Sequence, residues 1–347
     1  MNPPTENGPA REPRIVVIGG GSGSSVVLRG LKKHTSAITA IVTMFDSGGS
    51  TGILRKEFGY PPLGDLRQCL VALSDDDRAI DALRTAFEFR FSQNSSLNGH
   101  NVGNLVLAAL TSAHSDVQGA IDEMAQMFKV RGRIVPVTLQ DAHLCAELED
   151  GTVVRTESDI DLRGEETPPI RRVFLDREVK ANPAAVEAVI AADAVVMGPG
   201  DLYTSVVPNL LAAGIPDALK ATRARVIYVC NLMTKLGETG GYSASRFAAS
   251  LMQYMDRRLD YVFVNTRPVP PDVRERYAAE GAEPVEPDVE RLSAYADHVA
   301  GGELSNEGPP LRHDSAALAD LVVRISGGRD AALEQQPLPR PPAASGG

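Results

Sequence analysis

A cluster of glycines follows the first apolar segment, Ile15–Ile18. A continuous apolar run predicts a strand buried on both faces, and the apolar spacing after Ser25 predicts a helix. Where a buried strand, a glycine turn and a helix N-terminus meet, backbone N–H groups and the helix dipole favour an anion such as phosphate. A tight turn without a ligand is the structural alternative. The candidate phosphate-binding residues are Gly20, Gly21, Ser22 and Gly23.

This glycine run matches the dinucleotide fingerprint only in part, because Ser24 stands where the third glycine would be. No Gly-Lys-Ser/Thr follows it, which disfavours a P-loop kinase or ATPase. An NAD-dependent oxidoreductase is also disfavoured, since the spacing places no histidine or lysine as a proton carrier. The run therefore predicts a phosphate-binding turn that is neither a P-loop nor a complete dinucleotide fingerprint.

A second candidate loop follows the predicted strand Ile38–Met44. An acid at the end of the second strand of a doubly wound sheet commonly meets a ribose hydroxyl or a metal-bound phosphate. The glycines and hydroxyls after it offer further donors to an anion, and a solvated surface loop is the alternative. The candidate residues are Asp46, Ser47, Gly48 and Gly49.

Three further stretches place polar groups after strands or before helices. His100 and Asn104 precede an apolar helix, where they either bind a ligand or cap the helix. Gly198 and Gly200 repeat the first strand–turn–helix pattern, with a plain turn as the alternative. Asn231 follows another predicted strand, as does Thr234. Because open α/β sheets bind ligands at the carboxyl ends of their strands, we expect these groups to converge.

Strand and helix patterns alternate along the chain, which predicts an α/β, Rossmann-like fold with a mostly parallel sheet and helices on both faces. Asp150-Gly151 predicts a hairpin of Leu144–Leu148 and Thr152–Thr156, added antiparallel at one edge of the sheet. Ala79–Phe91 and Ala316–Ile325 are predicted packing helices. The other predicted strands are Arg133–Leu139, Arg172–Leu175, Ala194–Met197, Arg225–Cys230 and Tyr261–Val264.

The composition of the ends predicts three segments in this 347-residue chain. Residues 1–13 are rich in proline, asparagine and glycine, and residues 331–347 are rich in proline, alanine and glycine. Both lack periodicity and are expected to be disordered. Residues 14–330 are expected to form a single nucleotide-binding domain.

Charge and cysteine content exclude several classes of protein. The formal net charge of -10 argues against nucleic acid as a partner, because phosphate backbones require a basic face. Three separated cysteines in apolar surroundings predict reduced core residues rather than disulfides or a zinc site. No apolar run is long enough for a membrane span and no secretory signal is evident, so we expect a cytoplasmic protein without membrane contact.

The order of these motifs resembles the gluconeogenesis factor family (YvcK-like), which is related to the 2-phospho-L-lactate transferases (CofD-like). The resemblance covers about residues 14 to 326. It rests on Ile18–Gly23, Asp46–Gly52, Pro61–Arg67, Leu73-Ser74, Leu97–Leu105, Met197–Ser205, Cys230–Ser243 and a closing motif, Leu311–Ser315. Through this closing motif, the resemblance adds Arg312 to the candidate binding residues.

The resemblance implies a cytoplasmic protein that binds a UDP-sugar of the UDP-N-acetylglucosamine type and links carbon metabolism to cell-wall synthesis and cell shape. Such a protein would act through a cell-wall or metabolic protein partner. The resemblance leaves open whether the chain forms a homodimer. The alternative is an enzyme that uses Mg²⁺ to move a phospholactyl group from a guanosine dinucleotide to a deazaflavin. Related sequences often have paired aspartates after the second strand, whereas this chain has Asp46-Ser47. With Asp46 as the one candidate metal ligand or catalytic residue, we expect binding rather than turnover.

Overall fold

The structure, a computed structural model, describes residues 11–92, 96–114, 116–164, 166–306 and 308–327. Most of the two predicted disordered tails therefore lies outside the described residues. Within the N-terminal segment, the Arg11 side chain donates to Asp193 at 2.7 Å, and Glu12 accepts a hydrogen bond from the Ser36 backbone at 3.0 Å.

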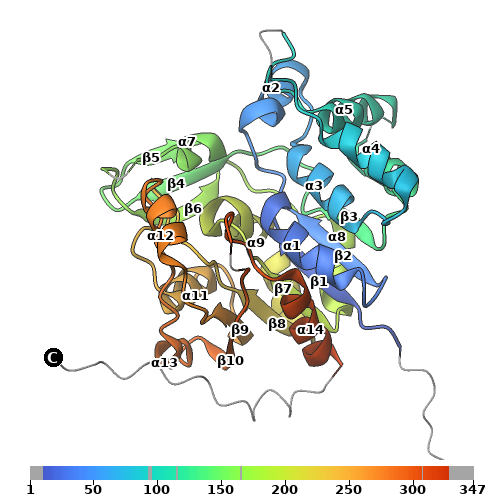
Figure 1. Cartoon of the computed structure of the whole chain (residues 1–347). Coiled ribbons are helices and arrows are strands. Elements are labelled where there is room, and N and C mark those ends of the chain that lie inside the picture. Colours follow the sequence, from blue (N-terminus) through green and yellow to red (C-terminus); the bar gives the residue numbers. More distant parts are fainter. Residues whose placement is uncertain (1–10, 93–95, 115, 165, 307, 328–347) are drawn as a thin grey trace, which may run out of the picture.

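Seven strands form a parallel sheet in the order β10-β9-β8-β7-β1-β2-β3 (Figure 1). Because β1 pairs with both β2 and β7, the order reverses there, and the switch point lies between β1 and β7. This confirms the predicted Rossmann-like fold. The strands are β1 (Ile15–Gly19), β2 (Ile38–Val42), β3 (Arg133–Pro136), β7 (Ala194–Met197), β8 (Arg225–Val229), β9 (Leu259–Asn265) and β10 (Ala296–Gly302).

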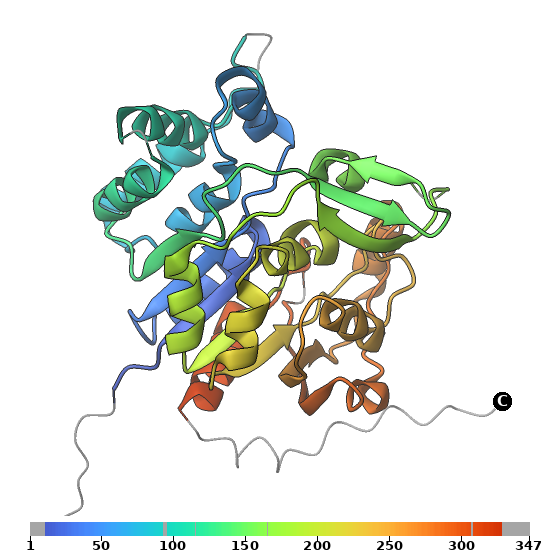
Figure 2. The ribbon, with the colours of Figure 1, turned by 180° about the vertical axis from the view of Figure 1, so that it is seen from behind.

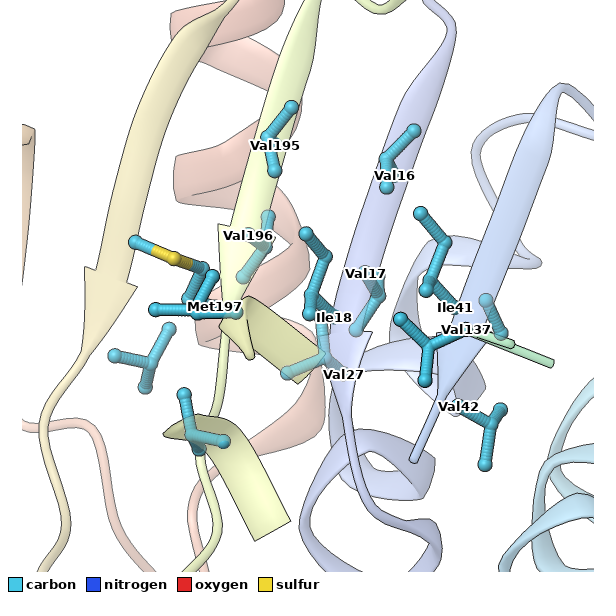
Figure 3. Close-up of a cluster of buried hydrophobic side chains, with 14 of the residues drawn as sticks. Val16, Val17, Ile18, Val27, Ile41, Val42, Val137, Val195, Val196 and Met197 are labelled. Atoms are coloured by element: carbon cyan, nitrogen blue, oxygen red, sulfur yellow. The ribbon is translucent and has the colours of Figure 1, made fainter. Parts of the chain in front are cut away.

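The core consists of this sheet and the helices that cover it. Val17 and Val196 of the central strands are fully buried and pack among other branched side chains (Figure 3). Helices α1 (Gly21–Leu31) and α14 (Ser315–Ser326) cover one face, and α8 (Pro183–Ala191) and α10 (Ile215–Ala221) cover the other (Figures 1 and 2). Covering both faces explains why these strands are apolar throughout.

The helices between β2 and β3 lie partly beside α1 on one face of the sheet and extend beyond the carboxyl end of β2 (Figure 1). They are α2 (Gly49–Phe58), α3 (Gly64–Leu73), α4 (Arg78–Glu88), α5 (Val102–His114) and α6 (Val117–Met127). The later part of the chain adds η1 (Leu202–Val206), a π-helical turn, followed by α9 (Val207–Leu210), α11 (Ala244–Met252), α12 (Pro271–Ala278) and α13 (Val289–Leu292).

The predicted hairpin is present, but its predicted position at the edge of the main sheet is wrong. The hairpin strands β4 (Leu144–Leu148) and β5 (Val153–Arg155) join β6 (Ile170–Leu175) in a separate antiparallel sheet of order β5-β4-β6. In β6, buried Val173 neighbours exposed Arg172, which pairs with Glu147 of β4. Such an amphipathic strand suits a sheet with one solvated face.

Strand β10 completes the parallel sheet at one edge and was missed from the sequence. It is an edge strand with mostly half-buried residues, so it lacks the apolar run of the central strands. Among the described residues, no helix combines the length and apolar character that crossing a membrane would require.

Candidate functional site

The glycine turn after β1 packs directly against a second glycine turn after β7. A Cβ on Gly23 would lie 2.0 Å from the Pro199 carbonyl oxygen, so only glycine permits this close approach. Gly20 precedes α1 and supplies no side-chain cap to the helix. The predicted turns Gly20–Gly23 and Gly198–Gly200 therefore meet at the switch point of the sheet, where a doubly wound fold binds its ligand.

Two carboxylates hold the loop after β2 by hydrogen bonds, one from within the loop and one from the segment after β5. Asp46 Oδ1 accepts the Gly48 backbone N–H at 2.8 Å, and Glu157 Oε2 accepts the Ser47 N–H at 3.1 Å. Glu157 begins α7 (Glu157–Asp161), the short helix after β5. Helix α7 thus contacts the Asp46–Gly49 loop.

Two carboxyl groups that the sequence analysis missed lie beside Asp46. Burial, followed by the charge of Asp46, raises the pKa of Asp65 to about 7 and that of Glu157 to about 8. Asp65 lies at the start of α3 and also accepts a hydrogen bond from the Gly21 backbone, which opposes the rise. Asp65 lies within the Pro61–Arg67 motif, a signal that was available in the sequence. Glu157 had no such signal.

His100 and Asn104 attach α5 to its neighbours. The His100 Nδ1 lies 3.2 Å from the Ser50 hydroxyl, and the Asn104 Oδ1 accepts the Arg67 Nε–H at 3.1 Å. Both residues are buried. These contacts are compatible with the structural alternative, although the Asn104 N–H at the helix start is bonded by Asn101 Oδ1, at 3.2 Å. Ligand binding by His100 and Asn104 stays a prediction.

Asn231 and Thr234 follow β8 but differ in what their side chains contact. Thr234 Oγ1 accepts the Glu283 backbone N–H at 2.9 Å, which fixes the loop. The Asn231 Oδ1 is buried and has no hydrogen-bond partner among the described residues. Asn231 borders a cavity of about 210 Å³ between the ends of β8 and β9, so its amide is available to a ligand.

Lys235, which the sequence analysis did not single out, links three carboxylates at this edge. Its ammonium contacts Asp161 at the end of α7, Asp201 at 2.7 Å and Glu238 at 2.8 Å. Burial alone would lower the pKa of Lys235, but the charges of Glu238 and Asp201 raise it. Carboxylate oxygens of the three acids lie within 4.8 Å of one another, so the ammonium serves as the cation of this cluster.

The residues around Arg312 border the carboxyl end of β8. His313 Nε2 lies 3.0 Å from the Cys230 carbonyl oxygen, at the end of that strand. The Arg312 side chain is exposed. The pKa of Arg29 on α1 is lowered first by the burial of Arg29 and second by the positive charge of Arg312. Arg312 is therefore close to the last turn of α1, at the opposite end of that helix from the glycine turn, and its predicted binding role stays a prediction.

A cavity of about 480 Å³ adjoins the Lys235 cluster. It lies between the end of α7, Asp201 after β7, the loop after β8 and the end of α12. Its volume is within the range of about 300–1,000 Å³ typical of small-molecule sites. The opposite edge of the sheet borders a cavity of about 330 Å³ near Arg14 and Arg133. The glycine turns line neither cavity, but Asp201 of the larger one directly follows Gly200 of the second turn.

The chain is similar to known proteins over most of its length. The family model described as 2-phospho-L-lactate transferase CofD matches residues 15–304. A gluconeogenesis factor from Halalkalibacterium halodurans is 41% identical, covering 90% of this chain and 96% of the relative. A gluconeogenesis factor from Bacillus subtilis is 40% identical, covering 91% of this chain and 98% of the relative.

A solved structure agrees with this assignment. The crystal structure of a UPF0052 family member from Bacillus halodurans superimposes with a TM-score of 0.85 at 41% identity. It covers 90% of this chain and 99% of the solved chain. The chain therefore belongs to the gluconeogenesis factor family, within the wider family that the 2-phospho-L-lactate transferase model describes.

Proposed function

We propose that this protein binds a UDP-sugar of the UDP-N-acetylglucosamine type and acts as a sensor. The observation that carries the proposal is the meeting of two glycine turns at the switch point, with Gly23 packed on Pro199. Backbone N–H groups at the start of α1 supply donors to a diphosphate. The names of the relatives, gluconeogenesis factors, support a role in carbon metabolism.

The sensor would act in the cytoplasm through a protein partner rather than through turnover. A cell-wall or metabolic protein is the partner we propose, which would connect sugar supply with wall synthesis and cell shape. Asn231, whose buried amide oxygen has no partner among the described residues, is positioned to contact the part of the ligand beyond the phosphates.

A nucleotide panel tests this function. Ligand that binds only the native state stabilises it by about 2.7 kcal/mol at a hundredfold excess over Kd. We therefore expect UDP-N-acetylglucosamine to raise the Tm by several degrees, and GDP and NAD to have little effect at the same concentration. Stabilisation by GDP or NAD without any by uridine nucleotides would contradict the proposal.

One observation favours a second candidate, the Mg²⁺-dependent phospholactyl transferase. The sequence offered only Asp46 as a metal ligand, but the structure places Asp65 and Glu157 beside it. Carboxylate oxygens are the ligands that Mg²⁺ prefers, and Glu157 shares a hydrogen bond with Asp46, so these two acids are the ones that would hold the ion. Bound there, Mg²⁺ would stabilise charge on a transferring phosphoryl group.

A further inference from the structure

The cavity beside Lys235 differs in character from the glycine turns. Leu162, Met233 and Tyr277 line part of its wall, and the Leu162 side chain is 81% exposed. Exposed leucines are common singly, but this one borders a cavity where it can pack against the apolar face of a ligand. Leu162 directly follows α7, and Tyr277 lies in α12; Figure 1 labels both helices.

The polar part of the wall offers mainly acceptors. Asp161, Asp201 and Glu280 line the cavity. Lys235 fixes Asp161 and Asp201 in place, and each carboxylate has a second oxygen able to accept a hydrogen bond from a hydroxyl. Carboxylates outnumber cations along this wall, so a second phosphate would be repelled. The charges therefore favour a neutral group that is rich in hydroxyls.

Arg163 also lines this cavity, and its Nη2 donates to the Pro168 carbonyl oxygen. Its side chain is buried at 8% exposure, and its Nε and Nη1 have no hydrogen-bond partner among the described residues. Buried polar groups are almost always paired, so unpaired donors indicate a place where a ligand or water completes the bonding. A neutral carbonyl oxygen, such as that of an acetamido group, is an acceptor that these N–H groups can bind.

We propose that this cavity is the sugar subsite, which holds the neutral hexosamine end of the nucleotide-sugar while the glycine turns hold its diphosphate. The inference rests on the proposed function, and it makes Leu162 and Glu280 specificity-determining residues. Asp201 supports the placement, since it borders the cavity and directly follows Gly200 of the second glycine turn. A ligand whose diphosphate contacts this turn can therefore extend into the cavity.

Thiol labelling tests the placement directly. Cys69, Cys145 and Cys230 are all buried, so Leu162→Cys would add the one readily accessible thiol among the described residues. UDP-N-acetylglucosamine should slow its labelling at least fivefold, whereas UDP should leave the rate within twofold. The matched control is Ile190→Cys, at an apolar position on α8 that is 52% exposed; neither ligand should slow its labelling. Equal protection of Leu162→Cys by UDP and by the nucleotide-sugar, or no protection by either, would overturn the subsite.

Calorimetric titration separates this inference from the proposed function. The variant Leu162→Ala/Glu280→Gln should weaken UDP-N-acetylglucosamine binding at least fivefold and leave the Kd for UDP within twofold. If both ligands bind but the ratio of their Kd values is unchanged, the subsite is wrong and the function stands. If the unmodified protein binds neither, the proposed function fails and the subsite fails with it.

Discussion

Packing within the protein, and not only ligand binding, requires glycine at positions of the glycine turns. A Cβ on Gly21 would lie 2.7 Å from the Asp65 Cα, so a side chain there would displace α3 before it met a phosphate. Loss of binding in Gly21→Val would therefore report a shifted helix. The neighbouring Ser22 is exposed and donates only to Gln68 Oε1, at 2.7 Å, which makes it the better position to probe.

A negative charge at position 22 should separate phosphate binding from stability. Ser22→Glu places a carboxylate in the first turn of α1, where it interacts favourably with the helix dipole but repels a diphosphate. We expect nucleotide affinity to fall at least tenfold, about 1.4 kcal/mol, with no loss of Tm. The control Ser22→Ala loses the same Gln68 bond without adding charge, and it should bind nearly normally. Unchanged affinity in Ser22→Glu would place the phosphates elsewhere.

The pH dependence of stability should carry a contribution from His313. Burial lowers its pKa to about 4, against 6.5 for the ordinary side chain. The unfolded chain therefore takes up the proton first, so this stability is present above pH 6.5 and is lost as the pH falls toward 4. At 1.36 kcal/mol per pKa unit the full loss is about 3 kcal/mol.

Urea unfolding at pH 4.5, 5.5 and 7 measures this contribution. His313→Gln keeps a donor for the Cys230 carbonyl but cannot titrate, so its free energy of unfolding should change less across this range than that of the unmodified protein. Carboxylates elsewhere contribute the same pH dependence to the free energy of unfolding of both proteins, so their contribution cancels when the two are compared. Parallel pH profiles for the two proteins would show that His313 does not carry the effect.

At the scale of elements, α7 is held at both of its ends. Its first residue, Glu157, accepts the Ser47 N–H from the loop after β2, and its last residue, Asp161, pairs with Lys235 from the loop after β8. Helix α7 thus spans the carboxyl edge of the parallel sheet, although it belongs to the small antiparallel sheet region. This explains how residues 144–175 take part in a site built on another sheet.

Removing one of these two attachments should loosen α7 without unfolding the protein. Asp161→Asn weakens the pair with Lys235, which is partly exposed, so we expect a cost of about 0.2–1 kcal/mol. Amide hydrogen exchange in residues 157–163 should accelerate, roughly up to fivefold for that cost. Asp159→Asn changes an exposed acid of the same helix that does not contact Lys235, and the new amide oxygen can still accept the hydrogen bond from the Thr156 hydroxyl, so it should alter this exchange less. Equal exchange in Asp161→Asn and the unmodified protein would mean that the Lys235 pair does not hold α7.

The sequence predicts those parts of the site that depend on local patterns. Glycine turns after buried strands are recognisable because strand, turn and helix are contiguous, as around Gly23 and Gly200. The proximity of Glu157 to the Asp46 loop was not predictable, because a bond across 110 residues depends on where the small sheet packs. For the same reason Arg172–Leu175 was predicted among the strands of the mostly parallel sheet, and this was wrong: β6 pairs antiparallel with β4 in the small sheet.

At the scale of the whole molecule, acids gather at one edge of the parallel sheet. Asp46, Asp65 and Glu157 lie on one side, and Asp161, Asp201 and Glu238 surround Lys235 on the other. The second group contains Lys235, whereas the first lies near two arginines: Arg55 donates to the Asp46 carbonyl oxygen at 3.3 Å, and the charge of Arg67 lowers the pKa of Asp65. The raised pKa values of Asp65 and Glu157 reflect burial and the charge of Asp46, so Asp46 is the residue of the first group whose change should affect both neighbours.

Turnover decides between the sensor and the transferase, and Asp46 is the residue to change. We expect Mg²⁺, guanosine-diphosphate-linked phospholactate and the deazaflavin acceptor to give no multiple turnovers with the purified protein, because the sensor responds by binding. Asp46→Asn should instead stabilise the ligand-free protein, most at pH 8, where ionised Asp65 and Glu157 would otherwise repel it. Thermal unfolding at pH 5 and pH 8 measures this, with Asp150→Asn in the exposed hairpin turn as the control. Nucleotide release over many turnovers that disappears in Asp46→Asn and persists in Asp150→Asn would replace the sensor with the transferase.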